Sequence, residues 1–275
     1  MLGGRRRQFW PAYTRVSAAG ALKHIALLQN LCHAIALQQL AWLFLPVVRH
    51  KCVAIQIGHS ARDALLQAQQ NCLAVGLTSL ADAGLDRADI DQMAALQQQG
   101  QLRLRLNVML NPTAANRTYY LQNGPVLTDQ LTVSSFKVYA DGALGSRGAS
   151  LLQHYSDKPD WAGFLLSSPE HFDSVANVIY AKGWQMCTHA IGDSGNRTML
   201  RIYSKYLKGK NDLRWRIEHA QVINQHDFNL FGASSIVPSV QPTHATSDMY
   251  WAGERLGSDR VKGAYAYKQL LQQNG

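Results

Sequence analysis

Acidic residues are absent from the N-terminal segment of the chain. Residues 1–51 hold seven of the 27 Lys and Arg side chains and none of the 18 Asp and Glu side chains. The remaining residues therefore carry 20 basic and 18 acidic side chains, so most of the net charge of +9 belongs to the N-terminal segment. Nucleic-acid binding usually needs a basic patch on the folded body. The charge distribution thus argues against nucleic acid as a partner.

Closely spaced cysteines are absent as well. The four cysteines are Cys32, Cys52, Cys72 and Cys187, and no two of them form a CxxC pair. A disulfide framework or a thiolate zinc site needs short or repeated spacings. We therefore expect a reduced, cytoplasmic chain.

One long apolar run is present, at residues 25–48, which contain no Lys, Arg, Asp or Glu. The run is long enough to span a bilayer. Five polar side chains interrupt it: Gln29, Asn30, His33, Gln38 and Gln39. The interruptions favour a soluble amphipathic helix, with membrane association through this run as the alternative. A third interpretation is that the acid-free block is not native sequence, so we separate a leader, residues 1–59, from a domain at 60–275.

From residue 60 onward, apolar runs of strand length alternate with helical patterns. The expected strands are 77–81, 102–109, a run that ends at Asp141, 184–189, 215–219 and 236–241. The expected helices are 64–73, 89–99, 168–183, 199–206, 228–231 and 259–272. Strands that alternate with helices predict a parallel sheet with right-handed crossovers. Six such units favour an α/β fold of the TIM type, a (β/α) barrel, over a doubly wound sheet.

Two histidines stand at the ends of successive predicted strands. His189 closes one strand and His219 the next, and barrel enzymes place their functional groups at the carboxyl ends of strands. One strand-and-helix unit separates the two, so we expect them to be neighbours at the mouth of the barrel. Two neutral imidazoles at that distance are natural ligands for zinc or a similar divalent ion. The alternative is that each histidine makes an ordinary hydrogen bond.

The stretch from Phe136 to Ala149, FKVYADGALGSRGA, brings a lysine into an apolar strand. Side chains alternate along a strand, so Lys137, Tyr139 and Asp141 should share one face where the strand ends. This pattern predicts either a catalytic lysine and carboxylate or an ordinary ion pair at the mouth of the sheet.

Several motifs, in this order, resemble the signatures of the type-3 amidohydrolases, the YtcJ-like group that includes the N-substituted formamide deformylases. They are KVYADGALGSRGA from Lys137, THAIGDSGNR from Thr188, RIEHAQV from Arg216, SVQPTHATSDM from Ser239, WAGERLG from Trp251 and AYAY at 264–267. The resemblance covers roughly residues 60–275. It implies a metal-dependent (β/α)8 barrel that uses a divalent metal, zinc, to hydrolyse amide-like, non-peptide C–N bonds in small molecules.

The resemblance also implies roles for individual residues. Lys137 corresponds to the strand-four lysine, which can be carboxylated to bridge two metals. His189 and His219 correspond to the metal ligands on strands five and six. His244 would contact the substrate or stabilise the developing oxyanion, with a loop-capping role as the alternative. Asp141 joins Lys137 and His244 as a candidate catalytic residue.

Three further polar residues near these motifs have expected structural roles. Asp193 should cap a helix or support the site from behind. Arg216 and Glu218 should form an ion pair on the face of their strand opposite His219, behind the barrel.

The chain departs from the family pattern at both ends of the barrel. An HxH pair of ligands should lie on the first strand, and no HxH occurs. The eighth strand should bring an aspartate; Gly257-Ser258-Asp259 shares the expected letters, but we interpret it as the N-terminal cap of a helix. Strands one and eight of a closed barrel are neighbours. We therefore expect an incomplete barrel, with about six of eight strands and two open edges.

This gap predicts weak metal binding and a truncated, weakly active or inactive form of the enzyme. The competing hypothesis is a noncatalytic module that is tethered to a membrane or binds a partner. Open sheet edges would also allow a homo-oligomer.

Overall fold

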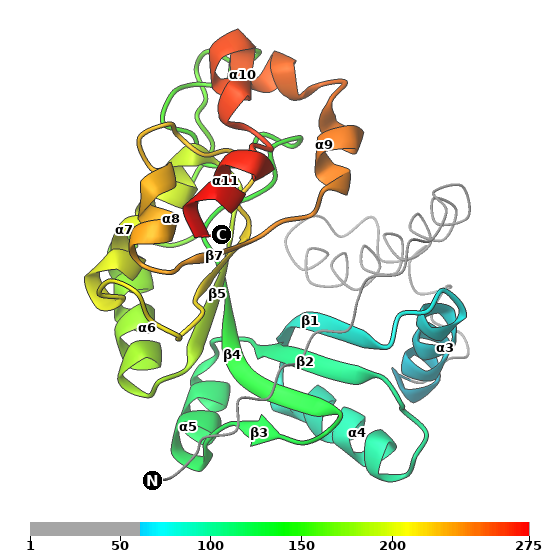
Figure 1. Ribbon diagram of the computed structural model, residues 1–275. Coiled ribbons are helices and arrows are strands. Elements are labelled where there is room, and N and C mark those ends of the chain that lie inside the picture. The colour runs from blue at the N-terminus through cyan, green and yellow to red at the C-terminus, as the bar shows by residue number, and fades with distance from the viewer. Residues whose placement is uncertain (1–60, 275) are drawn as a thin grey trace, which may run out of the picture. The chain divides into compact units, whose positions relative to one another are not determined.

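The computed structural model describes residues 61–274 (Figure 1). The chain divides into two units after Leu77, and the sheet lies entirely in the C-terminal unit. In the N-terminal unit, α3 (Ala61–Ala74) confirms the helix expected at 64–73. The predicted helix or membrane segment at 25–48 lies outside the described residues. Within 61–274, no helix is both long and apolar enough to cross a membrane.

Six parallel strands form a sheet that curls into half a barrel (Figure 1). Their order in space equals their order in the sequence, as right-handed crossovers in a barrel require. The short strand β3 (Val126–Leu127) pairs antiparallel with β4. The parallel strands are β1 (Ser79–Leu85), β2 (Arg105–Leu110), β4 (Leu131–Tyr139), β5 (Gln185–Ala190), β6 (Arg216–His219) and β7 (Val237–Ser239). This arrangement confirms the incomplete TIM-type barrel.

Helices connect the strands, and two of them, α6 and α7, pack against β5 and against each other. The helices of this unit are α4 (Arg87–Gln98), α5 (Ala114–Asn123), α6 (Pro169–Ala181), α7 (Asp193–Tyr206), α8 (Phe228–Ala233), α9 (Thr243–Asp248), α10 (Ala252–Arg260) and α11 (Tyr267–Asn274). The side of α6 that faces the protein buries Phe172, Val175, Ala176 and Ile179.

The bounds of α6 follow from local chemistry that the sequence displays. The Ser168 side chain accepts the His171 N–H at 3.3 Å, and Pro169 occupies the first helical position. N–H groups at a helix start lack a partner within the helix. Ser168 accepts one of them, and Pro169 has no N–H group that needs a partner. Gly183 follows the helix with a φ of 68°, a conformation that costs glycine little.

The prediction of a single helix at 259–272 is wrong. A 3-10 turn at Val261–Gly263 separates α10 from α11. The chain leaves the helical path because Tyr265 has a φ of 54° and donates its N–H to Gln221 O at 2.8 Å. Gly257, which was expected at a helix start, lies at a kink inside α10 with a φ of 75°. A contact with a distant segment thus overrides the local helical pattern.

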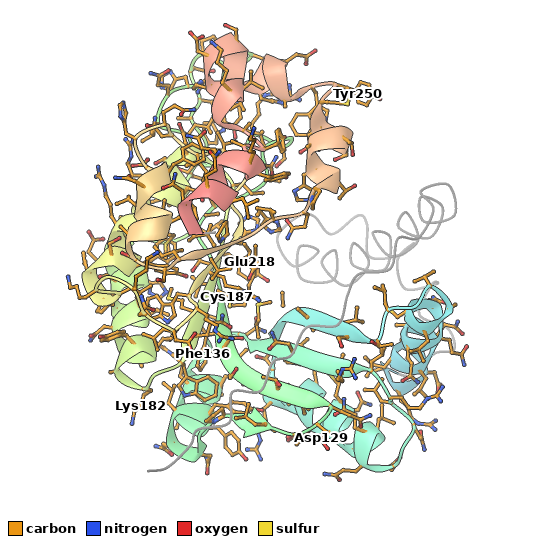
Figure 2. All side chains as sticks on the ribbon, in the orientation of Figure 1. Asp129, Phe136, Lys182, Cys187, Glu218 and Tyr250 are labelled. Carbon is orange, nitrogen blue, oxygen red and sulfur yellow. The ribbon has the colours of Figure 1, made fainter. Side chains whose placement is uncertain are left out.

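Strand register places a polar set of side chains on the concave face of the sheet. Lys137 pairs with Cys187, and Cys187 pairs in turn with Arg216. Two residues further along, His189 pairs with Glu218. Paired residues share a face of a sheet, and Cys187 and Glu218 can be located in Figure 2. Arg216 and Glu218 therefore share the inner face with Lys137, which corrects their predicted place behind the barrel.

Candidate metal centre at the strand ends

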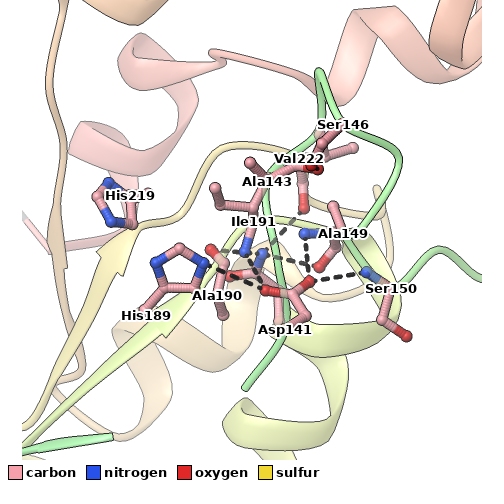
Figure 3. A network of polar contacts seen from close by, with 12 residues as sticks. Asp141, Ala143, Ser146, Ala149, Ser150, His189, Ala190, Ile191, His219 and Val222 are labelled. Atoms are coloured by element: carbon pink, nitrogen blue, oxygen red, sulfur yellow. Dashed lines mark hydrogen bonds and ion pairs between the residues drawn. The ribbon is translucent and has the colours of Figure 1, made fainter. Parts of the chain in front are cut away.

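The rings of His189 and His219 contact each other at the carboxyl ends of β5 and β6 (Figure 3). Their centroids lie 4.7 Å apart, and the ring planes cross at 74°. Strict strand alternation would send His219 to the face opposite Glu218. His219 instead has a φ of 75° and Ala220 a φ of 44°, so alternation ends there. The structure thus brings together the two histidines that their strand-end positions indicate.

Burial makes both imidazoles weak bases. It is the largest cause that lowers the pKa of His189 to about 3 and that of His219 to about 4. Both rings are therefore neutral at physiological pH. His189 Nε2 is buried without a hydrogen-bond partner among the described residues, and Asp141 Oδ1 lies 3.7 Å from it. A neutral, unpartnered ring nitrogen fits the role of a metal ligand.

Lys137 is the third candidate ligand, and its side chain is almost completely buried. Burial lowers the pKa of Lys137 to about 8, although the negative charge of Glu218 opposes this shift. A lysine amine reacts with CO2 or binds a metal only after it loses its proton. Within residues 61–274, no group of three His, Cys, Asp or Glu side chains is close enough to hold a metal ion. The two histidines and Lys137 fit a divalent ion by their chemistry.

Arg216 and Glu218 form the expected ion pair, with 2.8 Å between Arg216 Nε and Glu218 Oε1. Arg216 also reaches across the concave face, where its Nη2 lies 3.4 Å from Met109 Sδ. Glu218 raises the pKa of Lys137 and Arg216 lowers it, so their charges act on that amine in opposite directions. Sequence reasoning missed this neighbourhood because it placed the pair on the other face.

Tyr139 also lines the mouth of the barrel, although it was not among the candidate site residues. Lys137 Nζ lies 4.9 Å from the centroid of the Tyr139 ring, a distance typical of a cation–π contact. The Tyr139 ring lies 5.8 Å from that of His189, and 43% of the residue is exposed. Strand alternation predicts this place, because Tyr139 follows Lys137 by two residues on β4 and so shares its face.

Asp141 lies beyond the last residue of β4, and its carboxylate faces backbone N–H groups (Figure 3). It accepts hydrogen bonds from Ser150 at 2.9 Å, Ile191 at 3.0 Å and Gly192 at 2.8 Å. Burial raises the pKa of Asp141 to about 7, and these three donors oppose that shift. The expected strand-face pairing with Lys137 is therefore replaced by a connection between two loops.

His244 lies in α9, and its ring stacks on that of His219 with centroids 5.6 Å apart. The structure thus extends the row of imidazoles from His189 through His219 to His244. Asp193 is the first residue of α7, and Gly192 occupies the N-cap position. The Asp193 carboxylate accepts the Leu152 N–H at 2.9 Å and so supports the loop after β4 rather than capping its own helix.

The amidohydrolase family model matches residues 46–275. This chain therefore belongs to the amidohydrolase family, in the type-3 branch that its motifs resemble. The match begins within the segment that the sequence alone assigned to a leader.

Two related proteins match most of this chain. The Arabidopsis thaliana protein LONG AFTER FAR-RED 3 is 32% identical over 228 residues, which cover 78% of this chain and 39% of that protein. YtcJ of Bacillus subtilis, whose name assigns it to the amidohydrolases, is 29% identical over 78% of this chain and 41% of its own length. The chain thus spans well under half the length of these relatives.

Solved structures share the fold. The crystal structure of an uncharacterized metal-dependent hydrolase from Pyrococcus horikoshii aligns with a TM-score of 0.71 at 24% identity. The alignment covers 83% of this chain and 45% of that one. A similar protein from Pyrococcus furiosus gives the same TM-score at 23% identity.

Proposed function

We propose that this chain forms the divalent-metal side of a hydrolase that acts on amide-like, non-peptide C–N bonds in small molecules, with zinc as the metal. The observation that carries the proposal is the contact between two neutral imidazoles, His189 and His219, beside the buried Lys137. Family membership supports hydrolysis. The description of the Pyrococcus horikoshii protein as a metal-dependent hydrolase supports the metal.

The proposed ligands act through unprotonated nitrogen or through a modified amine. His189 and His219 would hold the ion by their free ring nitrogens. The neutral amine of Lys137 would first react with CO2, which forms an N–C bond and releases one proton, so that a carbamate oxygen becomes the ligand. When bound, a divalent ion polarises a carbonyl and lowers the pKa of water.

Of the remaining candidate residues, His244 contacts the substrate in this proposal and Asp141 holds a loop in place. His244 stacks on His219 at the mouth, where its ring can donate a hydrogen bond to the substrate carbonyl oxygen. Asp141 holds the loop after β4 next to His189 by its three backbone hydrogen bonds. Loop order of this kind keeps reacting groups in place.

A direct test uses the full chain, stripped with a chelator and then titrated with Zn²⁺. Bound zinc is measured by mass spectrometry of the metal, and hydrolysis of N-benzylformamide and N-acetylbenzylamine is measured by benzylamine release. We expect weak zinc binding and slow zinc-dependent release, in line with the weakly active form that the sequence predicts, and the double variant His189→Asn, His219→Asn should abolish both. The exposed His226, changed to Asn, is the matched control. A chain that binds no zinc and releases no amine would contradict the proposal and favour the noncatalytic partner-binding module.

A further inference from the structure

Gln241 lies two residues after β7, and its side-chain amide contacts the ring of His219. Gln241 Oε1 lies 2.7 Å from His219 Nδ1, and Gln241 Nε2 donates to Ser239 O at 3.2 Å. A reversed amide would point its oxygen at the Ser239 carbonyl, and two acceptors would then meet without a proton between them. The bond to Ser239 therefore sets the direction of the amide, with its oxygen towards the ring.

The direction of this amide fixes the tautomer of His219. An amide oxygen can only accept, so Nδ1 must carry the proton and donate it to Gln241 Oε1. In the neutral ring, Nε2 then keeps its lone pair. Histidines that bind metals commonly depend on such an outer hydrogen bond, which orients the ring and raises its basicity.

Residues from the C-terminal end of the chain hold this arrangement. Tyr267, on α11, donates its hydroxyl to Gln241 O at 3.0 Å. Tyr265 donates its N–H to Gln221 O at 2.8 Å. Gln221 lies two residues after His219 in the chain. The same short segment thus fixes both the acceptor and the stretch that carries the ring. His219 and Tyr265 both have positive φ, a strained state that persists only where the surroundings hold it.

We propose that Gln241 is a positioning residue that holds His219 as its Nδ1–H tautomer and so presents Nε2 to a divalent ion. This inference rests on the proposed metal-dependent function for its purpose, but the tautomer can be observed without metal. A neutral imidazole carries its proton on either ring nitrogen, and a merely structural role for Gln241 does not require that nitrogen to be Nδ1.

The tautomer is tested on the metal-free full chain with ¹⁵N-labelled histidine, by long-range proton–nitrogen correlation NMR. The His219 signals are assigned as those lost in His219→Asn. We expect a protonated Nδ1 and an unprotonated Nε2 in the unaltered chain. A protonated Nε2 in that chain overturns the proposal without any further variant.

Two substitutions separate the acceptor from the bulk of the side chain. Gln241→Glu gives up the bond to Ser239 O but keeps an acceptor oxygen beside Nδ1, so it should keep the Nδ1–H tautomer. Gln241→Met has similar length without an acceptor, so Nε2 should become protonated in part or in full. The control is Gln225→Met, because that side chain is exposed and contacts Gln269 instead of the site. An unchanged tautomer in a folded Gln241→Met chain would also overturn the proposal.

Metal affinity separates this inference from the proposed function. Zn²⁺ competition with a chromophoric chelator should give a Kd about 10–100-fold weaker in Gln241→Met than in Gln241→Glu. If the unaltered chain binds no Zn²⁺ but shows the expected tautomers, the proposed function fails and the positioning by Gln241 stands. If Zn²⁺ binds equally to both variants, the positioning role for metal binding fails while the proposed function stands.

Discussion

Gly192 donates its N–H to Asp141 Oδ2 at 2.8 Å, and this bond connects the loop after β4 to the start of α7. The N–H groups of Ser150 and Ile191 complete the shell of the same carboxylate. The Asp141 side chain is fully buried. A buried carboxylate that accepts several N–H groups contributes strongly to local order, because its removal leaves those donors without a partner.

Asp141→Asn should lower the free energy of unfolding by about 1–3 kcal/mol. The new amide nitrogen is a donor and faces the N–H groups that the lost carboxylate oxygen had satisfied. Urea unfolding followed by circular dichroism measures the change. Asp129→Asn, at an exposed loop position, should leave the free energy of unfolding unchanged. Equal stabilities of the two variants would contradict the role of the carboxylate.

Gly195 in α7 is required because of the same carboxylate. A Cβ on Gly195 would lie 2.6 Å from Asp141 Oδ2, well inside contact distance. Gly195→Ala should therefore destabilise the protein by about 1–3 kcal/mol, a cost typical of overpacking.

The control for this change is Gly253→Ala in α10, where an added Cβ meets no atom within 4 Å. Alanine favours helix over glycine by about 0.5–1 kcal/mol, so this variant should be slightly more stable. Thermal unfolding of both variants gives the comparison. The prediction fails if Gly195→Ala is as stable as Gly253→Ala.

Local chemistry made part of the fold predictable. Ser168, Pro169 and Gly183 mark the ends of α6 in the sequence itself, and the structure agrees within two residues. The same kind of signal could have found α5, which was not predicted. Thr113 caps that helix by accepting the Asn116 N–H at 3.2 Å. Helix ends of this type depend on a few neighbouring residues, so the sequence contains what is needed.

Tertiary contacts explain what the sequence could not predict. Alternation within RIEH places Glu218 and His219 on opposite faces, but the positive φ of His219 turns its ring towards His189. That turn depends on contacts with Gln241 and with the segment around Tyr265, which are distant in the chain. The strand-end positions of the histidines were therefore predictable, and the face of the Arg216–Glu218 pair was not.

Substitutions of His219 and of His244 should have different effects on zinc binding and on amide hydrolysis. His219→Asn should abolish zinc binding, because it removes a proposed ligand. His244→Asn should keep zinc bound and lower the rate of amide hydrolysis by about 100-fold, the loss typical of one donor to a developing oxyanion. Bound zinc per chain and the rate of benzylamine release measure the two effects. Loss of zinc in His244→Asn would show that His244 is a ligand instead.

The ion pairs of Asp157 make the free energy of unfolding depend on pH. Its carboxylate accepts hydrogen bonds from Arg147 Nε at 3.1 Å and Nη2 at 2.8 Å, and it also pairs with Arg255 on α10. The hydrogen bond from Arg147 is the largest cause that holds the pKa of Asp157 below its ordinary value. The native state therefore favours the ionised form more than the unfolded state does.

The sign of this linkage sets the expected pH profile. A carboxyl group with a lowered native pKa stabilises the protein above its unfolded pKa, about 3.9 for aspartate, and loses that contribution as the pH falls through the native value. Asp157→Asn should therefore be less stable than the unaltered chain at pH 7, and the gap should narrow towards pH 3. Urea unfolding at both values measures it. Asp212→Asn, which removes a highly exposed partner of Arg214, should show no such gap at either pH, since exposed pairs contribute little. A gap for Asp157→Asn that stays constant from pH 7 to pH 3 would contradict the assigned ion pair.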